Sequence, residues 1–215
     1  ERKEQPRRRN EPEEMRVETQ EEISHGSPGR SSREDGKGIV EDSGGLAHNP
    51  RPASLAPPLM PVNEELRVLK TLSYDATHYS LFVQAGSIGA LTRPGHFAML
   101  QAGDGLRPYL RRAFSIADIT TVAGVPALEF VVKVVGVGTA ALAHFAEGTP
   151  LPVLGPLGVP FPIDDLGRDD RVALVAGGIG LAPLVLLSRV LAARGVTAEL
   201  FYGGRNEKDV LKRAD

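Results

Sequence analysis

Short runs of β-branched and aliphatic residues follow one another closely between positions 66 and 154, and this spacing constrains the fold more than any other feature. Turn-forming residues separate them, including Arg93-Pro94-Gly95, Gly103-Asp104-Gly105 and Ala123-Gly124. Several short strands at close spacing are typical of a small antiparallel barrel. We therefore expect a six-stranded antiparallel β barrel with strands at residues 66–72, 79–85, 96–101, 113–117, 128–135 and 151–154. A single helix is predicted within it, at residues 139–147, where apolar residues share one helical face before Gly148.

The pattern changes at Arg171. An apolar strand at 172–176 leads into Gly177-Gly178-Ile179-Gly180 and an apolar helix at 181–193. A second strand at 198–202, Gly203-Gly204 and a polar helix start at Glu207 follow. This order predicts a parallel α/β unit whose first strand is covered on both faces. Doubly wound sheets have about five or six strands, so two strands indicate a truncated doubly wound domain.

These patterns divide the chain into three segments. Residues 62–165 are predicted to form the barrel domain, and residues 170–215 the N-terminal part of the α/β domain. Residues 1–61 have no aromatic side chain and bury too little apolar surface to offset the entropy of ordering, so we expect disorder. Two interpretations remain open for this segment: a flexible tail, or upstream sequence attached to a protein that starts at Met60. The Arg7-Arg8-Arg9 run is followed by acidic residues and reads as a solvated mixed-charge stretch.

Composition excludes several functions. The formal net charge of -2 gives no general electrostatic reason to bind nucleic acid or an anionic membrane. The chain has no cysteine and therefore neither disulfides nor thiolate ligands for an iron–sulfur cluster. No apolar run approaches the roughly 20 residues of a membrane-spanning helix, so the cytoplasm is the expected compartment.

The segment Arg112-Ala113-Phe114-Ser115 is a candidate flavin-binding strand. A guanidinium suits a diphosphate, an aromatic ring can lie against a flavin ring, and a hydroxyl can hydrogen-bond a ring nitrogen. On a regular strand, Arg112 and Phe114 would point to one face and the other two residues to the opposite face. The alternative interpretation is an edge strand with a solvated Arg pair and a core Phe.

A second candidate runs from Val131-Val132-Lys133 through a glycine turn to Gly138-Thr139 at the predicted helix start. Glycine allows backbone amides to approach a phosphate, and a helix start supplies free N–H groups. Alternatively, Thr139 is a plain helix cap and Lys133 a solvated strand charge.

The third candidate is the turn from Gly178 to Pro183, which follows a strand and opens a helix, as in pyrophosphate-binding turns. It reads GxGxxP, and proline is compatible with the first helical turn. Glycines kept only for packing are the alternative. His78, His96 and His144 are isolated in the sequence and are interpreted as surface or packing residues.

Taken together and in this order, the three segments resemble the ferredoxin reductase superfamily, and within it the electron-transfer subunits of dihydroorotate dehydrogenase B. Further supporting motifs are Pro94-Gly95-His96-Phe97, Gly155-Pro156-Leu157-Gly158 and Tyr202-Gly203-Gly204-Arg205-Asn206. The resemblance implies FAD contacts at Arg112, Ala113, Phe114, Ser115, Val131, Val132 and Lys133, and phosphate contacts at Gly138 and Thr139. It also implies that Ser115 tunes the flavin N5, and that Gly177, Gly178, Gly180, Gly203 and Arg205 border NAD(H).

The resemblance implies a flavin-dependent NAD(P)H oxidoreductase of pyrimidine biosynthesis. It would pass electrons between NAD(H) and a catalytic dihydroorotate dehydrogenase subunit, in a heterotetramer, through FAD and a 2Fe–2S cluster. The family's cluster cysteines lie in a C-terminal region that this chain does not include. Two alternatives stay open: a stand-alone NAD(P)H:flavin reductase or the related subunit of a sulfide dehydrogenase or NADH-dependent ferredoxin oxidoreductase, and a flavin-binding module without turnover.

Overall fold

The computed structural model of the chain describes residues 60–103, 109–206 and 209–211. The elements below lie in one compact unit that contains Pro61–Asp215. Most of the predicted N-terminal segment, the Asp104-Gly105 part of one predicted turn and the helix start at Glu207 lie outside the described residues. No helix in the described ranges combines the length and apolar character needed to cross a membrane.

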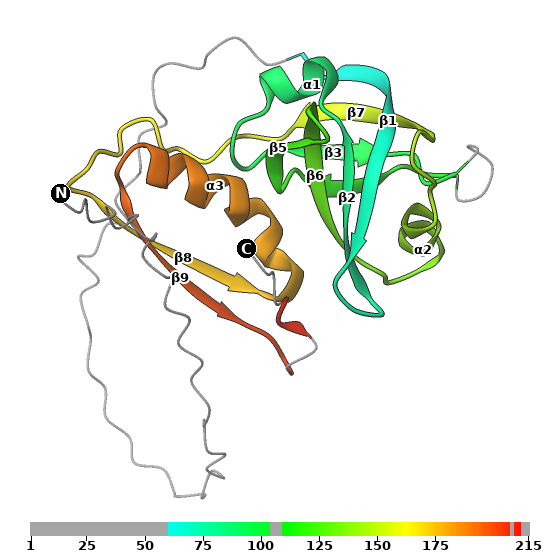
Figure 1. Cartoon of the computed structure of the whole chain (residues 1–215). Helices are drawn as coiled ribbons and strands as arrows, with labels where there is room; N and C mark the ends of the chain where they lie inside the picture. The colour runs from blue at the N-terminus through cyan, green and yellow to red at the C-terminus, as the bar shows by residue number, and fades with distance from the viewer. Residues whose placement is uncertain (1–59, 104–108, 207–208, 212–215) are drawn as a thin grey trace, which may run out of the picture. The chain divides into compact units, whose positions relative to one another are not determined.

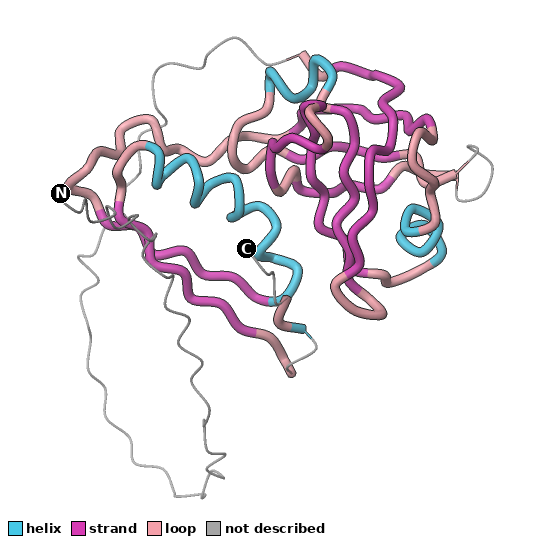
Figure 2. The backbone as a smooth tube through the Cα atoms, in the orientation of Figure 1, coloured by secondary structure: helices cyan, strands magenta, loops and turns pink. Residues whose placement is uncertain are grey.

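A seven-stranded antiparallel sheet forms the first region (Figures 1 and 2). Its strands are β1 (Val62–Ser73), β2 (His78–Gln84), β3 (Phe97–Leu100), β4 (Arg112–Ser115), β5 (Asp118–Val122), β6 (Val125–Lys133) and β7 (Pro150–Leu157). Their order across the sheet is β4-β3-β7-β1-β2-β6-β5, which makes β4 and β5 the edge strands. The predicted antiparallel, barrel-like class is confirmed, but the sheet has seven strands instead of six and is not closed by a ladder between its edges.

The additional strand is β5. The expected strand at 113–117 is split, because Ile116 and Ala117 direct their amides to His96 and Glu129 carbonyl groups, outside the β4 ladder. After this break β5 pairs with β6 across a turn at Ala123-Gly124, whose φ angles are 47° and 83°. Positive φ at both positions is typical of a tight hairpin turn. The predicted turn was therefore right, but the polar run before it concealed a strand.

Two helices accompany the sheet, where one was predicted. The missed helix is α1 (Gly86–Leu91), whose six residues are too few to display a helical repeat of apolar residues. The expected helix is α2 (Val137–Ala143), which begins two residues earlier and ends sooner than predicted. Phe145 still packs against the core, but from the turn that follows the helix.

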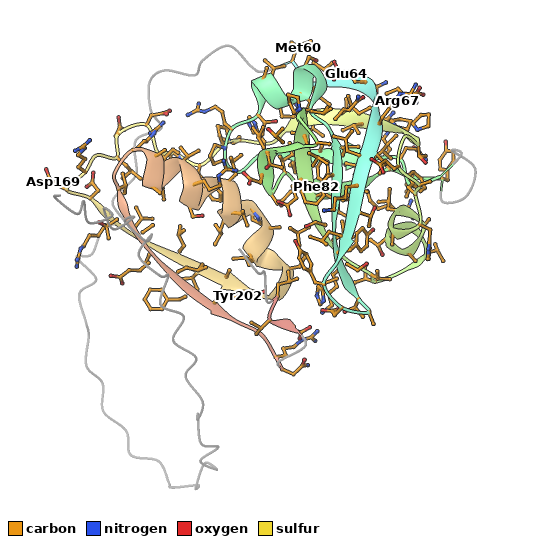
Figure 3. All side chains as sticks on the ribbon, in the orientation of Figure 1. Met60, Glu64, Arg67, Phe82, Asp169 and Tyr202 are labelled. Carbon is orange, nitrogen blue, oxygen red and sulfur yellow. The ribbon has the colours of Figure 1, made fainter. Side chains whose placement is uncertain are left out.

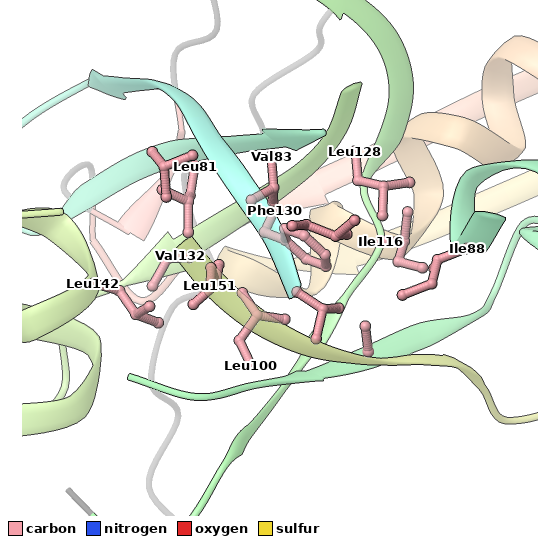
Figure 4. Close-up of a cluster of buried hydrophobic side chains, with 14 of the residues drawn as sticks. Leu81, Val83, Ile88, Leu100, Ile116, Leu128, Phe130, Val132, Leu142 and Leu151 are labelled. Atoms are coloured by element: carbon pink, nitrogen blue, oxygen red, sulfur yellow. The ribbon is translucent and has the colours of Figure 1, made fainter. Parts of the chain in front are cut away.

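One apolar core lies within the seven-stranded sheet, and Figure 4 shows its central side chains. Strand β6 divides its side chains between two surroundings. Leu128, Phe130 and Val132 point into this core, whereas Val131 belongs to a separate cluster on the other face of the strand. On that second face the buried Glu129 accepts a hydrogen bond from the Ser80 hydroxyl. Strand β6 is consequently buried on both faces.

The second region is a parallel pair, β8 (Arg171–Gly177) and β9 (Thr197–Gly203), connected by a 3-10 turn, η1 (Gly178–Leu181), and by α3 (Ala182–Ala193). Helix α3 packs along one face of the pair (Figure 1) through a cluster that includes Leu174, Leu187 and Leu191. The predicted strand–helix–strand unit is confirmed. The domain boundaries at 165 and 170 stay a prediction.

The expectation that the first strand is covered on both faces is wrong for the described residues. Val175 and Phe201, which are partners in the β8–β9 ladder, are 76% and 56% exposed. Apolar residues lie on both faces of β8, but the cluster that α3 and the segment around Ile163 form with the pair leaves Val175 and Phe201 exposed.

Phe130→Ala should lower the free energy of unfolding by about 3–5 kcal/mol, because a fully buried aromatic ring leaves a cavity when it is removed. The matched control Phe201→Ala removes an exposed ring and should cost less than about 1 kcal/mol. Urea denaturation followed by circular dichroism measures both. Equal losses for the two variants would contradict the assignment of the core.

Candidate functional site

An open cavity of about 480 Å³ runs along the edge strand β4. All four residues of the Arg112–Ser115 strand line it. On a regular strand, alternate side chains point to opposite faces, so only two of the four would be expected to face one cavity. Strand β4 lies at the edge of the sheet and has no neighbouring strand on one side, so residues from both of its faces can line a cavity there. The cavity thus offers a cation, an aromatic ring and a hydroxyl together.

Arg112 reaches from β4 to the start of α2. A Cβ atom added to Gly138 would lie 2.4 Å from Nε and 2.8 Å from Cζ of Arg112, so a side chain at this position would displace the guanidinium from its place against the helix start. Arg112 Nη1 also donates to the carbonyl of Leu110. Two segments that are distant in the sequence, both predicted to bind the same ligand, therefore meet directly.

The turn before α2 is organised by Thr139. Its hydroxyl accepts hydrogen bonds from the amides of Val135 and Gly136, at 2.9 Å and 3.2 Å, and donates to the Gly136 carbonyl at 3.0 Å. Thr139 lines the cavity but is the third residue of the helix, while Gly136 is the cap. The interpretation of Thr139 as the helix cap is thus wrong, because Gly136 occupies the cap position. The Thr139 hydroxyl nevertheless satisfies backbone groups of the turn.

Tyr79 fixes this turn to the sheet. Its buried hydroxyl donates to the Thr139 carbonyl at 2.6 Å. Burial raises the pKa of Tyr79 above its ordinary value, so the hydroxyl keeps its proton and remains a donor. The turn is therefore held by a hydrogen bond from Tyr79 of β2 and by the hydrogen bonds of the Thr139 hydroxyl.

A second open cavity, of about 580 Å³, lies at the ends of β8 and β9. Glycines line it on both strands: Gly177, Gly178, Gly203 and Gly204. A Cβ added at Gly177, Gly180 or Gly203 would meet no atom within 4 Å, so these glycines are not required by packing. Gly178 has φ +50°, a conformation that favours glycine. The packing alternative is therefore not supported at Gly177 and Gly180 of this turn.

The two cavities adjoin, because Lys133, Val135 and Ile179 line both. Gly180, which was predicted with the glycine turn, lines the cavity along β4 together with Ala182 and Pro183. Every predicted site residue except Gly138 lines one of the cavities, and Gly138 lies against Arg112. The roles assigned to them stay predictions.

Close contacts hold the glycine turn beside β4. The Leu186 amide of α3 donates to the Ala117 carbonyl at 2.8 Å, and Arg189 pairs with Asp118. Ala117 and Ala182 share a small buried cluster with Val131 and Leu211. Tyr202 on β9, labelled in Figure 3, donates to the Gly178 carbonyl at 3.1 Å. Backbone groups, small buried side chains, one ion pair and the Tyr202 hydroxyl thus fix the glycine turn beside β4.

Asp209 is a lining residue that the sequence analysis missed. Its carboxylate pairs with Lys133 Nζ and, at 3.3 Å, with Arg205 Nε. The hydrogen bond from Lys133 is the main cause that lowers the pKa of Asp209 below its usual value, and Arg205 adds to it. Asp209 follows Arg205 by four residues, the spacing of one helical turn, and that was the only available signal. Val135 and Ile179 lay within the predicted strand and glycine turn, but as apolar residues they were not named as site residues.

None of the described histidines, His78, His96 and His144, lines either cavity. His78 is buried and its Nδ1 lies 3.0 Å from Asp75 Oδ2, and the buried His96 accepts a hydrogen bond from the Arg93 amide. Burial, together with the charge of Arg93, lowers the pKa of His96. Among the residues that the structure describes, no group of three or more His, Cys, Asp or Glu side chains is placed to hold a metal.

Known proteins with similar sequences are named as electron transfer subunits. Over 132 residues the chain is 36% identical to the dihydroorotate dehydrogenase B (NAD(+)) electron transfer subunit of Bacillus velezensis, covering 61% of this chain and 51% of the relative. The corresponding subunit of Bacillus cereus is 35% identical over 135 residues, covering 62% and 50%. The chain is a homologue of these electron transfer subunits. It spans about half of their length. No family model matches the chain.

Solved structures agree on the fold. The NADH-dependent reduced ferredoxin-NADP oxidoreductase, a flavin-based electron-bifurcating protein, matches with a TM-score of 0.58 and 27% identity over 70% of this chain and 51% of its own. An Amycolatopsis cytochrome P450 reductase matches with a TM-score of 0.56 and 27% identity over 71% and 46%. This chain therefore has a ferredoxin reductase-like fold.

Thr139→Val should destabilise the turn before α2 by about 1 kcal/mol, because it removes the hydroxyl that satisfies two amides. Hydrogen exchange at Val135 and Gly136 should accelerate accordingly. Thr139→Ser is the matched control and should retain wild-type exchange, since it keeps the hydroxyl. Unchanged exchange in the Val variant would show that the turn does not depend on this group.

Proposed function

We propose that this chain is the FAD-dependent electron-transfer part of a dihydroorotate dehydrogenase B-type enzyme and exchanges electrons with NAD(H). The observation that carries the proposal is the pair of adjoining cavities with three shared lining residues. One cavity has the predicted flavin strand and the other the glycine turn. The homology to subunits named for electron transfer and for NAD(+) supports the same assignment.

The residues around the first cavity fit a flavin nucleotide. Arg112 supplies a guanidinium for the diphosphate, and Gly138 leaves it room. Phe114 and Ala113 offer an aromatic and a small apolar surface, while Val131, Val132 and Lys133 line the cavity from β6. Thr139 would act by shaping the phosphate-binding turn, because its hydroxyl already serves that turn.

The residues around the second cavity fit the nicotinamide nucleotide. Gly177, Gly178 and Gly180 leave backbone amides accessible beside the flavin cavity, and Gly203 and Arg205 border the far side. FAD, when bound, supplies the conversion between two-electron hydride chemistry and single-electron transfer. The chain itself would orient the two nucleotides, exclude water and place the Ser115 hydroxyl as a hydrogen-bond donor to N5.

The partner is proposed on the names of the relatives. An electron transfer subunit requires a catalytic subunit to receive or supply electrons, and we propose a dihydroorotate dehydrogenase catalytic subunit in a heterotetramer serving pyrimidine biosynthesis. The chain has no cysteine, so a 2Fe–2S cluster is not assigned to its residues. The cytoplasmic location stays a prediction.

A second candidate function follows from the solved structures. The resemblance to an NADH-dependent reduced ferredoxin-NADP oxidoreductase at 27% identity supports a related subunit that serves a different electron acceptor. Both candidates need the same two nucleotide sites. Reduction of a dihydroorotate dehydrogenase catalytic subunit, compared with reduction of ferredoxin under the same conditions, separates them.

The 215-residue protein should purify with FAD, and Arg112→Ala should weaken FAD binding about 10- to 100-fold, the effect expected from losing charge-assisted hydrogen bonds to a diphosphate. The matched control is Arg111→Ala. Arg111 is the preceding arginine, and it binds Asn63 Oδ1 at 2.9 Å and does not line either cavity. Fluorescence titration with FAD measures both. A protein that binds no FAD, or equal losses at the two arginines, would count against the flavin site.

Ser115→Ala should bind FAD but slow flavin reduction by NADH about tenfold, because one hydrogen bond that is stronger in the transition state is lost. Stopped-flow absorbance at the flavin band measures the rate, and the flavin reduction potential should shift in the same variant. Ser115→Thr retains the hydroxyl and serves as the control. A wild-type flavin that stays oxidised on mixing with NADH would refute the proposed activity itself.

A further inference from the structure

The cavity lined by glycines contains an unusual arrangement of charges. Asp209 lies between two cations, with Oδ1 on Lys133 Nζ and Oδ2 at 3.3 Å from Arg205 Nε. All three side chains line this cavity, and Asp209 is the only acid among its described lining residues. The Asp209 side chain is 12% exposed, whereas that of Arg205 is 89% exposed. A largely buried carboxylate thus engages both cations that the cavity offers.

The surroundings of the carboxylate suit a larger anion. Gly177 and Gly203 have open space where side chains would be, and a Cβ at Gly178 would meet only the backbone oxygen of Asp209, at 3.6 Å. Lysine, arginine and exposed backbone amides are the groups that bind phosphate oxygens. Because Asp209 neutralises one of the two positive charges, the cavity is less attractive to a diphosphate than its glycines and cations would otherwise make it.

We infer that Asp209 is an internal occupant of an anion-binding site. It holds Lys133 and Arg205 at the position where the pyrophosphate of a dinucleotide binds, and an incoming dinucleotide must displace it. The inference rests on the proposed use of a nicotinamide dinucleotide by this cavity. It adds a regulatory contact: the carboxylate lowers the affinity for the dinucleotide and ensures that Lys133 is released only when the site is filled.

The release of Lys133 has a consequence for the neighbouring cavity. Lys133 lines both cavities, and its ammonium group is bound by Asp209 in the structure. A pyrophosphate that takes the place of the carboxylate therefore changes the partner of a cation that also borders the flavin site. Filling one site in this way alters the electrostatic surroundings of the other.

The competing explanation is that Asp209 only stabilises the contact between the seven-stranded sheet and the α/β region through its ion pair with Lys133. The pair between Asp118 and Arg189 provides the matched control, because it also joins the seven-stranded sheet to the α/β region. Asp118 and Arg189 line neither cavity. Removing either carboxylate deletes one ion pair between the same two regions, but only Asp209→Asn removes an anion from the glycine-lined cavity.

The test is isothermal titration calorimetry of the 215-residue protein with two probes, inorganic pyrophosphate and ADP-ribose, neither of which can transfer a hydride. Asp209→Asn should bind both about tenfold more tightly than wild type, the effect of removing one negative charge in a partly solvated cavity. Asp118→Asn should bind them with wild-type affinity. Equal or weaker binding by Asp209→Asn overturns the inference.

A second variant keeps the test decisive if Asp209→Asn does not fold. Arg205→Gln changes an exposed side chain and should weaken the binding of both probes about three- to tenfold, because one cation of the site is lost. Unchanged affinity in that variant also overturns the inference. Flavin reduction by NADH is measured separately. If the flavin is reduced but Asp209→Asn leaves the affinity for both probes unchanged, this inference is refuted and the proposed function is not.

Discussion

The close approach of α3 to the seven-stranded sheet is the constraint on which the site depends. The Leu186 amide meets the Ala117 carbonyl at 2.8 Å, and Ala117 and Ala182 are buried together. Alanine side chains permit this approach, and a larger residue at either position would separate the two regions. Because the glycine turn directly precedes α3, the contact places Gly180 and Pro183 along the same cavity as β4. This backbone contact thus helps to set the relative position of the two cavities.

Much of this arrangement was accessible from the sequence. The strand–glycine–helix order at 172–193 predicted the parallel unit, and the Arg112-Ala113-Phe114-Ser115 strand predicted the residues along β4. These patterns succeed because glycine and alternating apolar residues report local backbone geometry directly. The strand β5 was missed because its residues are mostly polar, and helix α1 because six residues are too few to show a helical repeat.

Residues that act through long-range contacts could not be predicted. Asp209 pairs with Lys133, which lies 76 positions earlier, and nothing in the local sequence of either residue indicates that contact. The apolar Val135 and Ile179 were not among the predicted site residues, whereas both border the two cavities. A local sequence pattern predicts the secondary structure of one segment. The residues shared by the two cavities come from segments that meet only after folding.

The two-faced burial of β6 has a thermodynamic consequence. One face contributes Phe130 to the sheet's own core, and the other contributes Val131 to the cluster shared with α3. Loss of this strand would expose the sheet's own core and the cluster shared with α3 at once, so unfolding of β6 also removes apolar contacts of the α/β region. The free energy of opening this strand therefore includes contacts from both regions, whereas the cluster of Leu174, Leu187 and Leu191 does not involve β6.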